Sequence, residues 1–404
     1  MGGAVTGCRA RYIAEVTAAT TIRVTRGKLS RLAHAGLDSF AFRERAIGDL
    51  RAALPFDAAA WWTIDPASAL FTSCVFQPSP VDHAICAGVH GNELGDTDYN
   101  KFRVLARRSA KAEVLSAATG GQPERSDRYR HILAPLQYKH ELRLALSDNS
   151  VLWGGIALLR EPGGPDFTPA EVGRVASLGR ILTEGLRSGI ALGAAQVDCA
   201  PNGPGMLIVD DDLQILTMTP NAERWLDELT DGFPCLPNVG SSWLPEAVRS
   251  VVARARQPHG GDAPEDHMSR ARVRGSSGRW LAIYASRTRE TRPGSASIAV
   301  IIEEARPAEI APLIMDAYGL SPREARVTSL VLHGLSTREI ADEIHLSPYT
   351  VQDHLKAIFE KAGVRSRRVL AARVFGQYHL PRAGLGGNPP ESDGAVAGAY
   401  STVA

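Results

Sequence analysis

The feature that most constrains the fold of this chain is a series of helix-start signals near its C-terminal end. Residues 321–324 (SPRE) and 336–339 (STRE) are capping boxes, in which a serine and a glutamate bind the free backbone amides of a helix's first turn. Ser347 and Pro348 begin a third helix, with proline at the first helical position. Gly363 suits the C-terminal end of that helix. The sequence therefore predicts three short helices in close succession.

The second and third of these helices are separated only by the turn at residues 345–347. The second helix is about two turns long, and the third is longer. An apolar stripe at helical spacing runs along the third helix: Val351, Leu355, Ile358 and Ala362. Two short helices joined by a tight turn are the plan of the helix-turn-helix, whose second helix enters the DNA major groove.

The opposite face of the third helix is polar. With the apolar stripe turned to the core, Tyr349, Gln352, Asp353 and Lys356 point outward. Glutamine can pair with adenine, lysine with guanine and aspartate with cytosine in the major groove. Residues 348–380 carry a net charge of +4, as contact with phosphate requires. The alternative is the solvated face of an ordinary helical bundle, but the spacing of the capped helices favours DNA binding.

The stretch GLSPREARVTSLVLHGLSTREIADEIHLSPYTVQDHLKAIFEKAGVRSRRVLAARVF closely resembles the LuxR-type (GerE-like) helix-turn-helix domain over about 60 residues. The positions that fit the family pattern are Pro322, Arg323, Glu324, Gly334, Glu339, Ile340, Ala341, Ser347, Thr350, Val351, His354, Ile358, Lys361, Gly363, Val364 and Arg367. Thr328 departs from the pattern, because the family usually has an apolar residue there, and we expect only a local change in packing.

The resemblance implies roles for individual residues. Base contacts are expected at Gln352, Asp353 and Lys356. Phosphate contacts are expected at Thr337, Tyr349, Thr350, Lys361 and Arg367. Ser366 can cap a fourth helix, with Leu370, Val374 and Phe375 on one face. This helix is the family's usual dimerisation surface, which implies that the three residues face a partner. The implied partners are double-stranded DNA with palindromic sites, a second copy of the chain, and RNA polymerase as a further candidate.

The block of residues 29–195 combines strands with an opening and a closing helix. Residues 30–54 have helical periodicity, and residues 56–66 (FDAAAWWTIDP) and 151–160 (VLWGGIALLR) read as strands. A capping box at residues 168–171 (TPAE) begins the long closing helix. The two ends of this block resemble a GAF domain, which implies a sheet flanked by helices and a small-molecule ligand on one sheet face.

A Pro/Gly-rich break at residues 197–205 separates a second block, residues 203–304. Residues 206–220 read as a hairpin with an Asp-rich turn, residues 221–229 as a helix, and residues 270–287 as two strands around a Gly-Ser turn. A last strand follows. This block is similar to a PAS-like module.

The predicted fold class is multidomain, with two α+β sensor-like modules followed by an all-α four-helix domain at residues 314–380. Residues 1–28 are expected to form a disordered or loosely ordered extension, and residues 381–404 a disordered tail. The order GAF-like, PAS-like, LuxR-type resembles a class of actinobacterial regulators without a phosphorylated receiver. The acidic cluster of a receiver, the aromatic spacing of an acyl-homoserine-lactone sensor and a P-loop are not found in the sequence.

Several polar groups could suggest other chemistry. His83, Cys86 and His90 have the spacing of metal or haem ligands, but a closed zinc site needs four ligands, and isolated His and Cys are more often structural. The residues 210–212 (DDD) lie in a turn, where Asp is favoured. Of the neighbours Trp61 and Trp62, we expect one to be buried and one exposed. We expect no metal, no cofactor and no catalytic pair.

Composition indicates the compartment in which this chain works. The net charge is +1, the five cysteines are scattered without a C-x-x-C pair, and no apolar run approaches the roughly 20 residues that span a membrane. We therefore expect a cytoplasmic protein without a membrane partner. The leading hypothesis is a dimeric transcription regulator with signals sensed upstream. The alternatives are a protein–protein scaffold, or a first domain that processes a small molecule, with accessory DNA binding.

Overall fold

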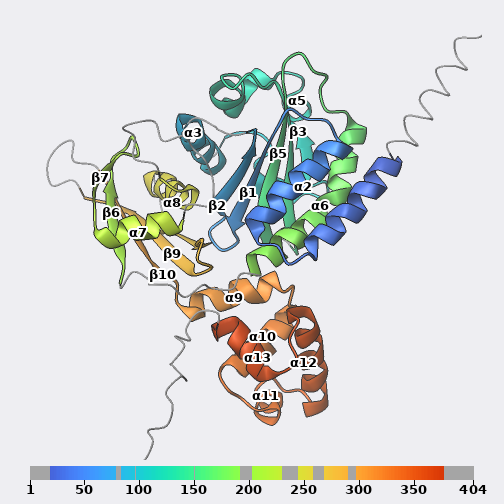
Figure 1. The fold of residues 1–404 in the computed structure, drawn as a ribbon, viewed down its shortest axis with the longest axis vertical. Helices are drawn as coiled ribbons and strands as arrows, with labels where there is room; N and C mark the ends of the chain where they lie inside the picture. The colour runs from blue at the N-terminus through green and yellow to red at the C-terminus, as the bar shows by residue number, and fades with distance from the viewer. Residues whose placement is uncertain are drawn as a thin grey trace, which may run out of the picture.

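A computed structural model describes residues 19–78, 83–95, 97–149, 151–191, 203–229, 244–257, 268–289 and 297–376, except for the side chains of 83–87, 375 and 376. Two sheet-containing modules lie side by side, and a helical domain lies below them in Figure 1. Helix α9 (Pro307–Ala317) lies between the sheets and the helical domain. The architecture of two α+β modules and a C-terminal helical region agrees with the predicted fold class.

The first module is built on a five-stranded antiparallel sheet with the strand order β2-β1-β5-β4-β3. Its strands are β1 (Ala58–Asp65), β2 (Leu70–Gln77), β3 (Ala112–Val114), β4 (His140–Asp148) and β5 (Val151–Arg160). Its helices are α2 (Ser39–Ala53), α3 (His83–Leu94), α4 (Phe102–Leu105), α5 (Leu115–Ala118) and α6 (Pro169–Ala191), with short turns η1 (Pro123–Arg125) and η2 (Tyr129–Leu133). The predicted strands and the closing helix are present.

Helices cover both faces of this sheet, so both tryptophans of β1 are buried. Trp61 packs in the core beneath α2 and α6 and is 0% exposed. Trp62 points to the other face, is 8% exposed, and stacks on Phe71 beside Phe102 of α4. The expectation that one of the two is exposed was wrong, because strand alternation divides them between two covered faces instead of between core and solvent.

The start of the chain differs from the expectation. Residues 19–33 form a helix, so residues 19–28 do not belong to a loose extension, and residues 1–18 lie outside the described part. The periodic stretch 30–54 is two helices, because the chain turns at Gly36 with φ +68° and restarts at the N-cap Asp38. Leu29 is fully buried against the same core as α2 and α6.

The second module has a sheet of the order β7-β6-β10-β9-β8, which is the same plan of second, first, fifth, fourth and third strand. Its strands are β6 (Gly205–Val209), β7 (Ile215–Met218), β8 (Ser269–Arg274), β9 (Trp280–Arg287) and β10 (Ile298–Glu304), and its helices are α7 (Pro220–Glu228) and α8 (Glu246–Arg256). The predicted hairpin, helix and strands are present. The sequence did not predict α8, which contacts β2 and α3 of the first module as well as its own sheet.

The helical domain consists of α10 (Pro322–Leu332), α11 (Thr337–Glu343), α12 (Pro348–Ala362), α13 (Arg367–Ala371) and the one-turn π-helix η3 (Ala372–Gly376). Its core is continuous with that of α9 and α6. The predicted tail, residues 381–404, lies outside the described residues. Within the described part of the chain, no helix is long and apolar enough to cross a membrane.

Candidate nucleic-acid interface

Side-chain caps fix the first turns of α10 and α11 as the sequence predicted. Ser321 Oγ accepts a hydrogen bond from the Glu324 amide at 3.3 Å, and Glu324 Oε2 accepts one from the Ser321 amide at 2.6 Å. Ser336 and Glu339 repeat this arrangement at 3.3 and 2.7 Å. Each box satisfies amides that have no partner inside the helix. The local sequence therefore determines where these helices begin.

The turn between α11 and α12 is tight and its geometry is defined. His345 adopts a left-handed conformation, with φ +54°. Ser347 Oγ then caps α12 by accepting a hydrogen bond from the Thr350 amide at 3.0 Å. Ile340 of α11 and Val351 of α12 are both fully buried in the common core. This packing sets the angle between α11 and α12.

The outer face of α12 is open to solvent. Tyr349 is 72% exposed, and Gln352, Asp353 and Lys356 are exposed on the same face. Lys356 Nζ lies 3.8 Å from Asp353 Oδ1, and both side chains are more than half exposed, at 79% and 52%. An exposed pair of this kind contributes little stability, so both groups are available to a partner. The structure thus brings the three predicted base-contacting residues together on one exposed face of α12.

Four of the five residues predicted to contact phosphate have side-chain partners within the domain, and the fifth, Tyr349, is exposed. Arg367 donates to the Leu335 carbonyl at 2.7 Å and to Thr337 Oγ1 at 2.8 Å. Thr350 Oγ1 lies 2.8 Å from the cap Ser347 Oγ. Lys361 Nζ lies 2.6 Å from Glu324 Oε2. The contacts of Arg367 and Lys361 connect different helices, whereas that of Thr350 lies within the first turn of α12. Contact with phosphate by these side chains stays a prediction.

The Lys361–Glu324 pair joins the C-terminal turn of α12 to the start of α10. Burial alone would raise the pKa of Glu324, but hydrogen bonds from Lys361 and Ser321 outweigh burial and hold the pKa of Glu324 below its usual value. Thr328, which departs from the family pattern, is fully buried in α10. Its hydroxyl has no hydrogen-bond partner within the described part of the chain.

The predicted dimerisation residues are not on a free surface. Leu370 and Val374 are 0% exposed, because η3 packs against α9 and α13 packs against α10. In this arrangement they belong to the chain's own core, and their contact with a second copy of the chain stays a prediction. The side chain of Phe375 lies outside the described residues.

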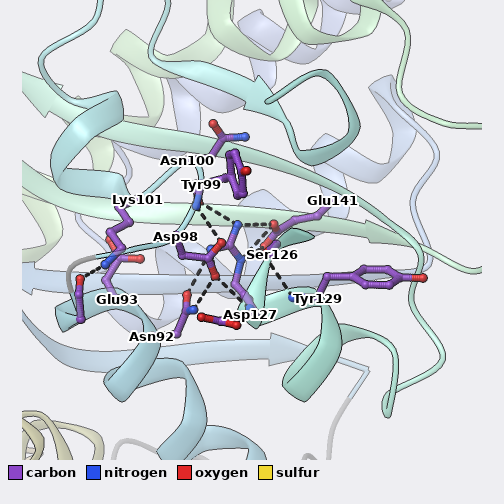
Figure 2. Close-up of polar contacts among 12 residues, drawn as sticks. Asn92, Glu93, Asp98, Tyr99, Asn100, Lys101, Ser126, Asp127, Tyr129 and Glu141 are labelled. Atoms are coloured by element: carbon purple, nitrogen blue, oxygen red, sulfur yellow. Dashed lines mark hydrogen bonds and ion pairs between the residues drawn. The ribbon is translucent and has the colours of Figure 1, made fainter. Parts of the chain in front are cut away.

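A buried polar network lies on the α3–α4 side of the first sheet (Figure 2). Arg128 Nη2 lies 2.8 Å from Glu141 Oε2, and the backbone amide of Arg128 donates a hydrogen bond to Asp98. Arg143 Nη2 lies 2.9 Å from Glu93 Oε2. Burial alone would raise the pKa of Asp98, but the Asn92 amide and Arg128 outweigh it and lower that pKa. Each of the two guanidinium groups is paired with at least one carboxylate. These pairs fit a role in holding the segment between α3 and β4 in place.

Two of the residues that could suggest metal chemistry, His90 and Asp210, have other partners in the structure. His90 is buried between the modules, with Nδ1 2.9 Å from Ser250 Oγ and Nε2 3.2 Å from Glu246 Oε1. The side chains of His83 and Cys86 lie outside the described residues. Asp210 Oδ1 accepts two backbone hydrogen bonds inside its turn, at 2.9 and 2.8 Å. Among the described residues, no group of three His, Cys, Asp or Glu could hold a metal ion.

Sequence reasoning missed the residues that connect the modules. Arg272 of β8 forms a buried ion pair with Asp65 of β1, and Arg187 of α6 donates to the Ala317 carbonyl of α9. Both pairings are distant in sequence and no local pattern marks them. Amphipathic spacing in residues 246–256 could have revealed α8.

The capped helices, tight turn and exposed α12 define a helix-turn-helix domain of the LuxR type. Residues 319–374 match the family described as bacterial regulatory proteins, luxR family. The chain is 42% identical over 60 residues to the "Probable HTH-type transcriptional regulator GfsR" of Streptomyces halstedii. That alignment covers 15% of this chain, and the chain spans about a quarter of the length of that curated relative.

Solved structures give weaker likenesses. A Vibrio cholerae VqmA–ligand–DNA complex is 18% identical, covers 45% of this chain and 86% of its own, and has a TM-score of 0.22. The E. coli DhaR(N)–DhaL complex is 14% identical, covers 72% of this chain and 90% of its own, and has a TM-score of 0.18. Scores this low carry no argument about fold or function.

Proposed function

We propose that this protein is a sequence-specific DNA-binding transcription regulator. The observation that carries the proposal is the exposed face of α12, where Gln352, Asp353 and Lys356 lie together above a buried apolar stripe. These side chains supply hydrogen-bond donors and acceptors that suit base edges in the major groove. The match of residues 319–374 to the LuxR-type family supports the same reading. A protein with this partner works in the cytoplasm.

The two upstream modules are proposed to sense the signal. The first is GAF-like and the second PAS-like, and neither is proposed to be a phosphorylated receiver. Support comes from their shared strand order and from the helices on both faces of the first sheet. The proposal assigns no catalytic role to the chain and treats DNA binding as its activity. A scaffold without a ligand and a first module that turns over a small molecule are the competing functions.

The regulator is proposed to bind DNA as a homodimer, since a two-fold protein suits a palindromic site. In the present arrangement η3, with Val374, packs against α9, and α13, with Leu370, packs against α10, so dimerisation through α13 and η3 requires these contacts to change. RNA polymerase is a further proposed partner on DNA. A signal that favours the arrangement with α13 uncovered would shift the population toward the DNA-binding form.

The direct test is capture of genomic DNA fragments by the full-length protein at one fixed salt concentration. Salt must be fixed because non-specific binding depends steeply on it. Enrichment of a limited set of fragments with a shared palindrome supports the proposal. Uniform recovery of fragments, with an affinity equal to that for random DNA, contradicts it. Turnover of a small molecule by the full-length protein would favour the enzymatic alternative.

A further inference from the structure

A cavity of about 560 Å³ lies in the first module, between the edge of its sheet and helix α6. Its walls come from the residues just before β3, from the end of β4 and from one face of α6. This volume falls in the range that holds small-molecule ligands. The cavity is separate from the helix-turn-helix surface and from the buried network of Figure 2.

The cavity presents cationic groups that no carboxylate neutralises. Arg180 has no ion pair or hydrogen bond with any described residue, and Lys111 Nζ donates to the Ser147 carbonyl at 2.7 Å without a carboxylate within 4 Å in the described chain. The two carboxylates of the lining have other partners, since Glu184 lies 3.4 Å from Nε2 of His34, outside the lining, and Asp148 pairs with Arg187, a third cationic residue of the lining. The local field therefore favours an anion.

A buried hydroxyl points to the same conclusion. Ser147 is 7% exposed, lines the cavity, and its Oγ has no hydrogen-bond partner among the described residues. Leaving a buried hydroxyl without a partner is costly, and a bound acceptor would remove that cost.

One residue of the cavity lining is a glycine inside a helix. Gly179 lies in the middle of α6, where glycine is less favourable than alanine. A Cβ at this position would meet only Leu144, at 3.5 Å, which is ordinary van der Waals contact. Packing therefore does not require glycine at this position, which lies next to Arg180 in the lining.

Arg187 connects the cavity to the DNA-binding domain. One of its nitrogens binds Asp148 at the cavity wall, while Nε and Nη2 donate to the Ala317 carbonyl at 3.3 and 3.2 Å. Ala317 is the last residue of α9, and Gly319, which follows at φ +67°, leads into α10. An anion in the cavity would compete with Asp148 for Arg187 and so act on this junction.

We propose that this cavity binds a small organic anion, with a carboxylate or phosphate group held by Lys111, Arg180 and the Ser147 hydroxyl. Arg187 then transmits occupancy to the junction between α9 and α10, which changes the affinity for DNA. The binding site stands on the cavity alone, and its effect on DNA rests on the function proposed above. Phosphate esters and carboxylic acids are the two classes of compound that could supply this anionic group.

The test uses thermal unfolding of the full-length protein with inorganic phosphate, glycerol 3-phosphate, citrate and benzoate. Each is compared with sodium chloride at equal ionic strength, and glycerol and benzamide are the neutral counterparts. At about 100 times its dissociation constant, a binding anion should raise the melting temperature by a few degrees. Arg180→Ala and Lys111→Met should each weaken the binding of that anion about tenfold or more, since each removes a charge-assisted hydrogen bond.

Arg174→Ala is the matched control, because Arg174 lies on the same helix but outside the cavity lining. A shift that persists unchanged in Arg180→Ala and Lys111→Met, or no shift with any of the four anions, overturns the site. The DNA dissociation constant with and without the bound anion then tests the coupling: a change of about threefold or more supports it, and equality overturns it. If the full-length protein binds no DNA under any of these conditions, the proposed function is wrong. The thermal unfolding result alone then decides whether the cavity binds an anion.

Discussion

Arg272 of the second module and Asp65 of the first form an ion pair of 2.6 Å, with side chains only 8% and 2% exposed. Asp65 also accepts a hydrogen bond from the backbone amide of Arg272 at 3.2 Å. A third donor of Arg272 reaches the Glu309 carbonyl of α9 at 2.7 Å. One guanidinium group therefore joins both sheets to the helix that leads into the DNA-binding domain.

Removing either partner of this pair should destabilise the protein strongly. Asp65→Asn and Arg272→Met should each cost about 3–5 kcal/mol, because the remaining charge is left buried without its partner. The double variant should cost much less than the sum, and urea unfolding of the four proteins measures this non-additivity. Asp49→Asn is the control, since the side chains of the Lys28–Asp49 pair are 49% and 25% exposed and lie 3.7 Å apart, and it should cost about 1 kcal/mol or less. Strictly additive losses at Asp65 and Arg272 would show that the pair does not hold the modules together.

The contact between the modules at Glu246 predicts a dependence on pH. Burial raises the pKa of Glu246, but His90 and Arg249 outweigh burial and lower it to about 2 from a usual value of 4.5. Because the folded state depresses this pKa, the stabilisation is complete above pH 4.5 and is lost as the pH falls toward about 2. At pH 7 it is on the order of 3 kcal/mol.

Glu246→Gln should therefore lower the urea midpoint most at pH 7, and the difference from the wild type should shrink between pH 4.5 and 3.5. Glu184→Gln is a suitable control, because the Glu184 side chain is 48% exposed and should show little change. A difference between wild type and Glu246→Gln that stays constant with pH would contradict the assignment.

Two glycines of α6 should respond to alanine with opposite signs. A Cβ at Gly185 would lie 2.1 Å from Phe42 Cζ, so Gly185→Ala forces α2 and α6 apart and should destabilise by about 1–3 kcal/mol. At Gly173 nothing lies within 4 Å of an added Cβ, and Gly173→Ala should stabilise by up to about 1 kcal/mol through helix propensity. Thermal unfolding of the two variants tests both predictions. If Gly185→Ala is as stable as the wild type, α2 and α6 are not packed this closely.

Lys361→Met separates a structural role from contact with phosphate. Loss of the 2.6 Å pair with Glu324 should lower stability by about 1 kcal/mol, a modest value because Lys361 is 39% exposed. If Lys361 also contacts phosphate, the slope of log affinity against log salt should fall by about 1. A lower stability with an unchanged salt slope would remove Lys361 from the predicted phosphate contacts.

Local sequence signals were sufficient for the DNA-binding domain. Capping boxes act within four residues, so Ser321 and Ser336 could be assigned as helix starts without any knowledge of the fold. The apolar stripe of α12 likewise determined which face is buried. The predicted strands around residues 58–65 and 151–160 are correct because each is a short apolar run bounded by turns.

Long-range packing explains what the sequence could not supply. The burial of Trp62 depends on α4, and the burial of Val374 in η3 depends on α9, which is separated from it by the four helices α10 to α13. The pairing of Asp65 with Arg272 spans two modules. The cavity beside α6 arises from residues of three separate segments, so neither its volume nor its charge can be read from any one of them.

The most direct test of the account is the affinity of the full-length protein for a captured DNA fragment, at fixed salt, in the wild type and in Gln352→Ala and Lys356→Ala. Each variant should lose about 1–3 kcal/mol of specific binding and relax the sequence preference at one base position. Arg45→Ala, an exposed residue on α2, should bind like the wild type. If both variants keep the affinity and the sequence preference of the wild type, α12 does not read DNA bases and the central claim is wrong.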